Sequence, residues 1–375
     1  MSHSEDSNTP TLLTTKIDIR TDYDELHGGM GHEWDHNYGC GSEKKDAATQ
    51  FVPCVVKKDV SVQVKPFMLN EHKRFKISDH IESNSQLNTW TGISTFKILE
   101  CIENNIQDAR ETLKLNAKQY HLDLTSIIML IFIRIKLNVS FQLISILFSI
   151  SAKTCRSYFE EVLPILSLVF RCAIIWPTKM EIMQSLPNCF SKYKNTRVVI
   201  DCTEIPVEKP KCLQCAIKVY SFYKSGETIK FLVGVTPSGL VSFVSLPYGG
   251  RASDKAITNQ SELFSMLDPF EAIMADKGFL IEEECEANFI KLIRPPFLRN
   301  KTQFNYKEAE ENCGIAAARV HVERAIQRMK IFKILKTKYP FRKANEIEDI
   351  MTVVSAMVNL SNPILSDDKF IKKKM

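Results

Sequence analysis

The sequence lacks the features that mark several common classes of protein. It has no Walker phosphate-binding loop and no dinucleotide-binding glycine fingerprint, which excludes the two best-known nucleotide-binding motifs. The first ten residues are polar and acidic and contain no apolar core, so a secretory signal peptide is not expected. The most apolar stretch, 127–150, is interrupted by Arg134 and Lys136 and therefore predicts a buried helix instead of a membrane span.

A disulfide framework is also not expected. The eleven cysteines are scattered and odd in number, which favours free thiols in a reducing compartment. Cys212 and Cys215 form a CxxC without a second pair at zinc spacing, and we interpret them as incidental thiols. A weaker candidate zinc set, whose spacing matches no strong pattern, consists of His32, His36, Cys40 and Cys54.

Glycine is absent between Gly92 and Gly226, whereas five of the thirteen glycines fall between Gly226 and Gly250. The first stretch should therefore be mostly helical and the second rich in strands and turns. With 375 residues, 44% of them hydrophobic, the chain can bury a core and form two or three domains. We expect a flexible leader over 1–85, a helical module over 90–190, a mixed α/β domain over 195–362 and a basic tail over 363–375.

Two serines define the most informative part of the helical module. Ser140 can cap a helix that runs through Phe148, and Ser151 can cap the next helix, to about Val162. Two short-linked helices of this kind are typical of a helix-turn-helix, whose second helix enters the DNA major groove. A compact helical bundle would show the same periodicity. The residues predicted to contact DNA are Lys153, Thr154, Arg156 and Ser157.

The pattern of the α/β domain predicts alternating strands and helices. Strands are expected at 197–201, 228–235, 240–246, 271–276 and 291–293, the second and third joined as a hairpin by the turn 236–239. Helices are expected from the cap Ser253 to about Leu267, over 307–336 and over 347–360. The long helix over 307–336 has an apolar stripe of helical period made of Ile315, Ala318, Val322, Ile326, Met329 and Phe332.

Three carboxylates carry the leading functional hypothesis. Asp201 and Asp276 each end a short apolar run, and Glu323 borders the apolar stripe of the long helix. Ligands at the ends of neighbouring strands can converge, and carboxylate oxygens suit hard divalent cations, which can activate a phosphodiester for cleavage. The alternatives are that the aspartates are turn or cap residues and that Glu323 pairs with Arg319 or Gln327.

Two other carboxylates compete with these three. Glu204 lies three positions after Asp201, so a continuing strand would turn it to the opposite face of the sheet. Asp254 follows the cap residue Ser253 and is expected to interact with the helix dipole. Both therefore rank lower as metal ligands.

The long helix is strongly basic. Residues 315–339 contain seven Lys or Arg residues and one acid, Glu323, a pattern that suits a DNA backbone but also a solvated helix face. The residues of this helix predicted to contact phosphates are Arg319, Arg324, Arg328 and Lys330.

These residues lie in segments that resemble the DDE superfamily endonucleases of the PIF/Harbinger-type transposase group. The resembling segments include VVIDCTEIPVEKP (198–210), IMADKGFLIEEE (273–284) and IAAARVHVERAIQRMKIFKIL (315–335), and 122–159 resembles the helix-turn-helix module that precedes this nuclease. The resemblance implies an RNase H-like core, a catalytic and metal-binding triad of Asp201, Asp276 and Glu323, a divalent cation (Mg²⁺ or Mn²⁺) and a DNA substrate.

Two functional hypotheses follow. The first is a metal-dependent DNA endonuclease of transposase type, which cleaves phosphodiesters and transfers strands. The alternative is a domesticated, catalytically silent DNA-binding protein descended from such an enzyme. Double-stranded DNA is the expected partner, together with a homodimer or a separate DNA-binding protein, because the THAP-type zinc finger of some relatives is not recognised in the sequence. Nuclear residence is inferred from the substrate, and no membrane association is expected.

Overall fold

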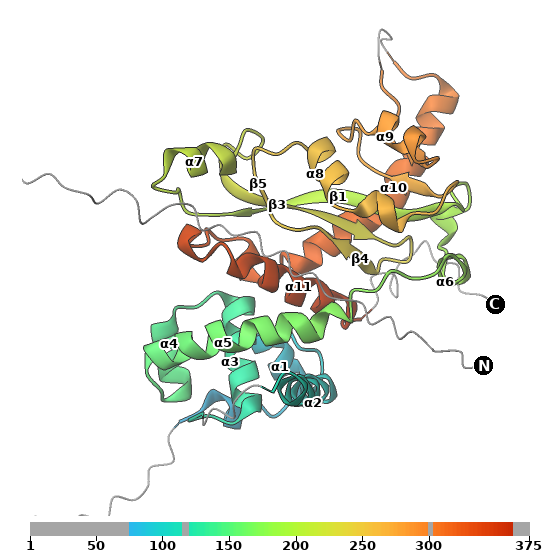
Figure 1. Ribbon diagram of the computed structural model, residues 1–375. Coiled ribbons are helices and arrows are strands. Elements are labelled where there is room, and N and C mark those ends of the chain that lie inside the picture. The colour runs from blue at the N-terminus through green and yellow to red at the C-terminus, as the bar shows by residue number, and fades with distance from the viewer. Residues whose placement is uncertain (1–74, 115–119, 299–302, 363–375) are drawn as a thin grey trace, which may run out of the picture. The chain divides into compact units, whose positions relative to one another are not determined.

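The computed structural model describes residues 75–114, 120–298 and 303–362 (Figure 1). The basic tail, the candidate zinc set at 32–54 and most of the predicted leader lie outside the described residues. The last part of the range predicted as leader, 1–85, is ordered, because a 3-10 helix, η1 (Ile77–His80), and the start of α1 (Asn84–Thr91) fall within it.

The helical part contains the predicted helix-turn-helix. It consists of α1, α2 (Phe96–Thr112), α3 (Leu124–Leu137), α4 (Phe141–Phe148) and α5 (Ala152–Arg171). The two predicted caps are present: Ser140 Oγ accepts from the Leu143 N–H at 3.2 Å, and Ser151 Oγ accepts from the Thr154 N–H at 3.0 Å.

The helix after the turn is longer than predicted. α5 continues past Val162 and contains Pro164, which the sequence pattern alone would place near a helix end. Leu166 and Phe170 extend its buried face, so the apolar contacts of the second half outweigh the backbone hydrogen bond that proline cannot donate.

A mixed sheet forms the second part, with β1 (Thr196–Pro206) near its centre. On one side β1 pairs antiparallel with β3 (Gly226–Val235), and β3 pairs antiparallel with β4 (Val241–Val244), as the predicted hairpin requires. On the other side β1 pairs parallel with β6 (Ala272–Met274), and β6 pairs parallel with β7 (Lys291–Ile293). Two short strands, β2 (Tyr220–Ser221) and β5 (Tyr248–Gly249), extend the outer side of β3.

Helices cover both faces of this sheet (Figure 1). One face carries α8 (Asp254–Gln260), η3 (Leu263–Met266) and α9 (Glu282–Ala287), and the other carries α10 (Tyr306–Met329) and α11 (Glu346–Asn359). Successive residues of β1 alternate between the faces: Val199 belongs to the core beneath α10 and α11, and Ile200 belongs to the core beneath α8. Shorter elements complete the domain, namely α6 (Lys179–Gln184), η2 (Asn188–Phe190), α7 (Leu213–Val219), η4 (Lys333–Leu335) and η5 (Phe341–Lys343).

Two predicted helices are shorter in the structure. The helix predicted over 307–336 ends at Met329, because the chain turns into η4 and thereby buries Phe332, Ile334 and Leu335. The helix that Ser253 caps ends at Gln260, before the prediction of Leu267. All six residues of the predicted apolar stripe are buried, which confirms the stripe, although the helix ends earlier than predicted.

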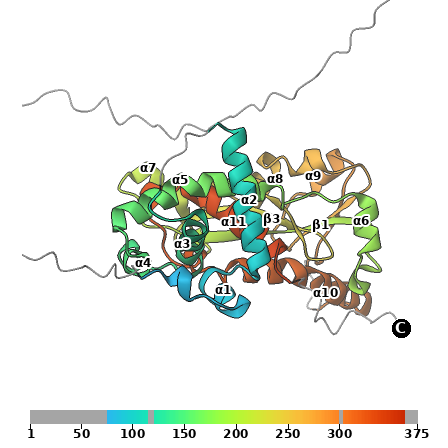
Figure 2. The same ribbon diagram turned by 90° about the horizontal axis from the view of Figure 1, so that it is seen from below.

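α5 of the helical part packs against α11 of the sheet part (Figure 1 and Figure 2). Arg171 pairs with Glu348 at 3.3 Å, and one hydrophobic cluster is continuous across both helices. Asn359, at the end of α11, donates from Nδ2 to the carbonyls of Ala173 (2.9 Å) and Val241 (2.8 Å), so it joins the chain after α5 to β4. In the described residues, no helix combines the length and the apolar character of a membrane span.

Candidate active site

Asp201 and Asp276 belong to neighbouring segments of the sheet domain, the first within β1 and the second just after β6. β1 and β6 run parallel, with Val199 opposite Met274. Asp201 comes two residues after Val199, and Asp276 comes two residues after Met274. Neighbouring strands are about 4.8 Å apart. Because successive side chains of a strand point to opposite faces, Asp201 lies on the same face of the sheet as Val199, which is the face covered by α10. The prediction that both aspartates end a strand is correct only for Asp276, just beyond β6; Asp201 is inside β1, because pairing with β3 extends β1 to Pro206.

Arg319 of α10 connects Asp276 with Glu323. Its Nη1 donates to Asp276 Oδ1 at 2.9 Å, and its Nη2 lies 3.7 Å from Glu323 Oε1, one turn along the helix. The Arg319 side chain is only 12% exposed, whereas the carboxylates of Asp276 and Glu323 are 51% and 59% exposed. The pairing of Glu323 with Arg319 that the sequence left open as an alternative is therefore present.

The surroundings of Asp201 raise the pKa of its carboxyl group. Burial raises its pKa to about 6, and the negative charges of Asp276 and Asp254 add to the increase. The Cys202 N–H, which donates to Asp201 Oδ1 at 2.8 Å, and the nearby Arg319 guanidinium act in the opposite direction. A carboxyl group with this pKa changes its charge close to neutral pH, which is typical of functional sites.

The chemistry of these side chains fits a hard divalent cation, since all three predicted ligands offer carboxylate oxygens. In the part of the chain that the structure describes, no group of three or more His, Cys, Asp or Glu side chains is gathered closely enough to hold a metal ion. The guanidinium of Arg319 is the positive charge that contacts Asp276 and Glu323 in this structure.

The other predicted phosphate contacts on and after α10 differ in their surroundings. Lys330 is half-buried, and burial lowers the pKa of its ammonium group; the charge of Lys224 acts in the same direction, and the charge of Asp201 opposes it. Arg328 donates from Nη1 to the carbonyl of Asn362. Arg324 is half-buried on the same helix. Of the residues predicted to contact phosphates, Arg319 directly contacts two of the three acids, Asp276 and Glu323.

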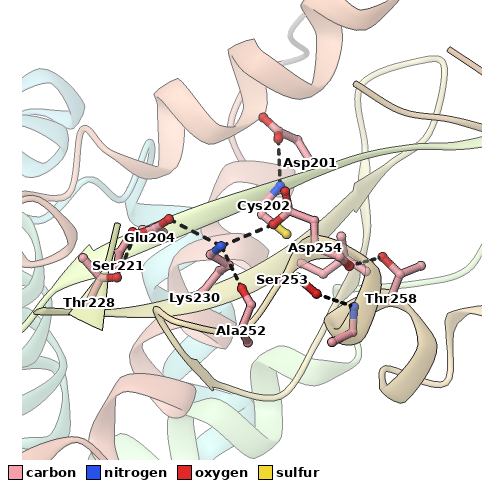
Figure 3. A network of polar contacts seen from close by, with 12 residues as sticks. Asp201, Cys202, Glu204, Ser221, Thr228, Lys230, Ala252, Ser253, Asp254 and Thr258 are labelled. Carbon is pink, nitrogen blue, oxygen red and sulfur yellow. Dashed lines mark hydrogen bonds and ion pairs between the residues drawn. The ribbon is translucent and has the colours of Figure 1, made fainter. Parts of the chain in front are cut away.

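Lys230 forms a buried ionic cluster on the opposite face of the sheet (Figure 3). Its Nζ lies 3.6 Å from Glu204 Oε1 and 3.3 Å from Asp254 Oδ1, and it donates to the Ala252 carbonyl at 3.1 Å. The prediction that Glu204 faces away from Asp201 is confirmed, because Glu204 pairs across β1–β3 with Lys230. Sequence reasoning missed Lys230, although a lysine inside an otherwise apolar strand such as Ile229–Val235 signals a buried partner.

The four predicted groove contacts stand at the start of α5. Lys153 and Arg156 are exposed. Thr154 and Ser157 are half-buried and already bonded, Thr154 Oγ1 to Ser151 Oγ at 2.8 Å and Ser157 Oγ to Glu161 Oε1 at 2.5 Å. The two basic residues are therefore the side chains of this set most open to a DNA phosphate.

The cysteines of the CxxC are free thiols at the start of α7. The Cys215 N–H donates to Cys212 Sγ at 3.4 Å, which gives Cys212 the role of helix N-cap. Their interpretation as thiols without a metal partner stays a prediction.

Comparisons with known proteins agree with this architecture. Residues 200–359 match the family model described as DDE superfamily endonuclease, and residues 120–172 match the model described as helix-turn-helix of DDE superfamily endonuclease. No curated protein and no solved structure gave a match. The chain thus carries an RNase H-like nuclease core preceded by a helix-turn-helix module, and both parts point to DNA as the partner.

Proposed function

We propose that this DDE superfamily endonuclease domain cuts DNA in a reaction of transposase type, with Asp201, Asp276 and Glu323 as the ligands of Mg²⁺ or Mn²⁺. One observation supports the proposal most: Asp201 and Asp276 each follow by two residues the last β1–β6 pair, Val199 and Met274, and Arg319 contacts both Asp276 and Glu323. All three acids fall inside the matched nuclease range of 200–359.

Some residues of the chain would act at the reacting phosphate, and others would bind the DNA around it. A bound divalent cation supplies Lewis acidity at the phosphate and a more acidic attacking water. Asp201 would hold this cation in its ionised form, because a carboxylate must lose its proton to bind a metal, and burial raises its pKa to about 6 in the metal-free protein. Arg319 and Lys330 neutralise the phosphate oxygens, while Arg324 and Arg328 contact the backbone further along α10. Attack of water on the phosphorus would break its bond to the 3′ oxygen and leave a 3′ hydroxyl and a 5′ phosphate. In strand transfer, that hydroxyl would attack a phosphodiester of the target DNA and displace the 3′ oxygen of the target strand.

DNA recognition is assigned to the helix-turn-helix. Ser151 places Lys153, Thr154, Arg156 and Ser157 in the first turns of α5, the end of a recognition helix that meets base edges and phosphates. The substrate is double-stranded DNA, read by a homodimer or with a separate DNA-binding protein. The proposal includes membership of the PIF/Harbinger-type group and residence in the nucleus, which a fluorescently tagged full-length chain would test by microscopy.

A catalytically silent DNA-binding protein is the second candidate. The ion pairs of Arg319 favour it, because a guanidinium that neutralises Asp276 and Glu323 competes with a metal ion for the same oxygens. This candidate binds DNA equally well with chelator and with Mg²⁺ and never nicks it.

The deciding experiment is a nicking assay on supercoiled plasmid with Mg²⁺ or Mn²⁺. Asp201→Asn, Asp276→Asn and Glu323→Gln should each lose at least about 100-fold in rate, since each loss of about 1.4 kcal/mol of transition-state stabilisation is tenfold. Matched controls are the exposed acids Asp268→Asn and Glu311→Gln, which should cut normally. Nicking that persists in the three site variants, or is absent from the parent protein with every ion, would overturn the assignment.

A further inference from the structure

Two aromatic rings stand out in solvent at the turn between β2 and β3. Phe222 is 74% exposed and Tyr223 is 82% exposed. They follow Ser221, which is buried and whose Oγ accepts from the Lys224 N–H at 3.2 Å, so the turn is anchored below the rings. We call residues 220–225 the aromatic turn. Adjacent large rings at a turn tip contribute nothing to the core, which indicates a binding role.

Each ring of the aromatic turn has a cation beside it. The Lys224 ammonium lies 4.5 Å from the Tyr223 ring centroid, and the Arg251 guanidinium lies 6.0 Å from the Phe222 ring centroid. Tyr220 meets Phe222 edge to face, with ring centroids 5.4 Å apart. Rings alternating with positive charge suit a ligand that is both flat and anionic.

The second cation is fixed in place by the backbone. The Arg251 N–H donates to the Lys218 carbonyl at the end of α7, at 3.2 Å. Gly250 precedes it, and a Cβ at Gly250 would lie 2.7 Å from the Val219 carbonyl oxygen, so only glycine permits this close approach. The backbone at Arg251 is therefore fixed next to the end of α7 and to β3, from where its side chain reaches the Phe222 ring.

β3 connects the aromatic turn with the candidate active site. The strand begins at Gly226, directly after the turn, and its Val233 lies opposite Asp201. Seven residues of strand span about 23 Å, so one bound nucleic-acid strand of several nucleotides can reach both places.

We propose that the aromatic turn binds unpaired bases of a DNA strand that also reaches the proposed site of cleavage, with Phe222 and Tyr223 as stacking surfaces and Lys224 and Arg251 as phosphate contacts. Bases in an intact duplex are stacked on one another and offer the rings no face, so the ligand is a single strand or an opened end. The inference rests on the proposed function for its relation to a cut, but the binding itself requires no cutting.

The test measures equilibrium binding by full-length protein in chelator, where no cleavage takes place. Three DNAs of equal length are compared by fluorescence anisotropy: a duplex, a single strand, and a duplex with a few unpaired nucleotides at one end. Phe222→Ala/Tyr223→Ala should weaken binding of the single strand and of the unpaired end by about tenfold or more. Binding of the duplex should change by less than about twofold.

Two further variants distinguish the effect of losing ring stacking from the effect of losing positive charge and from that of removing any exposed ring. Lys224→Gln/Arg251→Gln should weaken all three DNAs and reduce the slope of binding against salt, because phosphates are common to them. Tyr306→Ala removes an equally exposed ring (83%) from the start of α10 and should change nothing.

A fluorescent base in the unpaired end gives an independent test of stacking. A 2-aminopurine in the unpaired end should change its fluorescence on binding the parent protein and not on binding the double-ring variant. If the double-ring variant loses affinity equally for duplex and single strand, or binds every DNA as the parent does, the proposal is wrong. It is also wrong if the double-ring variant loses self-association, because the turn would then be a contact between copies of the chain. A protein that never nicks plasmid yet passes this test would refute the nuclease and leave the base-binding turn intact.

Discussion

Nη1 of Arg319 lies 2.9 Å from Oδ1 of Asp276, and this contact ties α10 to the end of β6. The same guanidinium reaches Glu323, so one buried cation contacts two of the three acids proposed to bind metal. At the proposed metal site, a metal ion and Arg319 would therefore compete for the same oxygens.

Removal of Arg319 should strengthen metal binding. We expect Arg319→Gln to bind Mn²⁺ about fivefold more tightly, from a screened repulsion of about 1 kcal/mol, and to lower the melting temperature of the metal-free protein. Thermal unfolding across a Mn²⁺ titration measures both effects. Lys307→Gln, at an exposed position of the same helix, is the control. Unchanged or weaker Mn²⁺ binding would show that Arg319 does not occupy the metal's place.

Stability of the metal-free protein should depend on pH through Asp201. Its folded pKa of about 6 exceeds the unfolded value, so the protonated form stabilises the fold and this contribution is lost as pH rises through about 6. Asp201→Asn should therefore unfold at a higher temperature than the parent at about pH 8, with little difference at about pH 4. Melting curves in chelator at several pH values provide the measurement, and a gap that widens towards low pH would contradict it.

Lys230 should be essential to stability. Its side chain is 10% exposed and neutralises Glu204, which is 6% exposed. Lys230→Met leaves buried carboxylates without a partner and should cost about 3–5 kcal/mol in the free energy of unfolding. Lys291→Met, on an exposed position of β7, is the matched control and should cost little.

A second substitution distinguishes charge from packing at this cluster. Adding Glu204→Gln to Lys230→Met neutralises one unpaired carboxylate and should recover about 1 kcal/mol or more. Urea denaturation measures each free energy. Simple addition of the two single-variant costs would mean that the pair is not coupled.

The helix-turn-helix should read duplex DNA through its two exposed cations. Lys153→Ala and Arg156→Ala should each weaken duplex binding and reduce the dependence of log affinity on log salt concentration by roughly one charge. Lys179→Ala, exposed at the start of α6, serves as the comparison. Salt titrations that give identical slopes for all three variants would place the duplex on another surface.

Local sequence patterns predicted the parts of the fold that local physics determines. Ser140 and Ser151 cap helices as expected, and the stripe from Ile315 to Phe332 is buried, because capping and periodicity are short-range properties. The length of β1 was underestimated, since its second half is held by pairing with β3, which no local pattern reveals.

The roles of the candidate site residues stay a prediction, and their contacts could not be predicted from the sequence. The aspartates were recognised at the ends of apolar runs, and Arg319 was expected to contact DNA. The structure pairs Arg319 with Asp276, 43 positions away in the sequence, and pairs Lys230 with Asp254 on the far face of the sheet. Contacts of this range depend on how the strands are ordered, and α7 and the aromatic turn carried no periodic signal at all.

Asn359 holds the end of α11, the start of β4 and the carbonyl after α5 with one amide group. These hydrogen bonds connect the chain after α5, the helix of the proposed DNA contacts, with the sheet of the proposed cleavage site. Under the proposed function, the number of base pairs between the recognised sequence and the cut would be set by this connection, and base pairs inserted between them should reduce cutting.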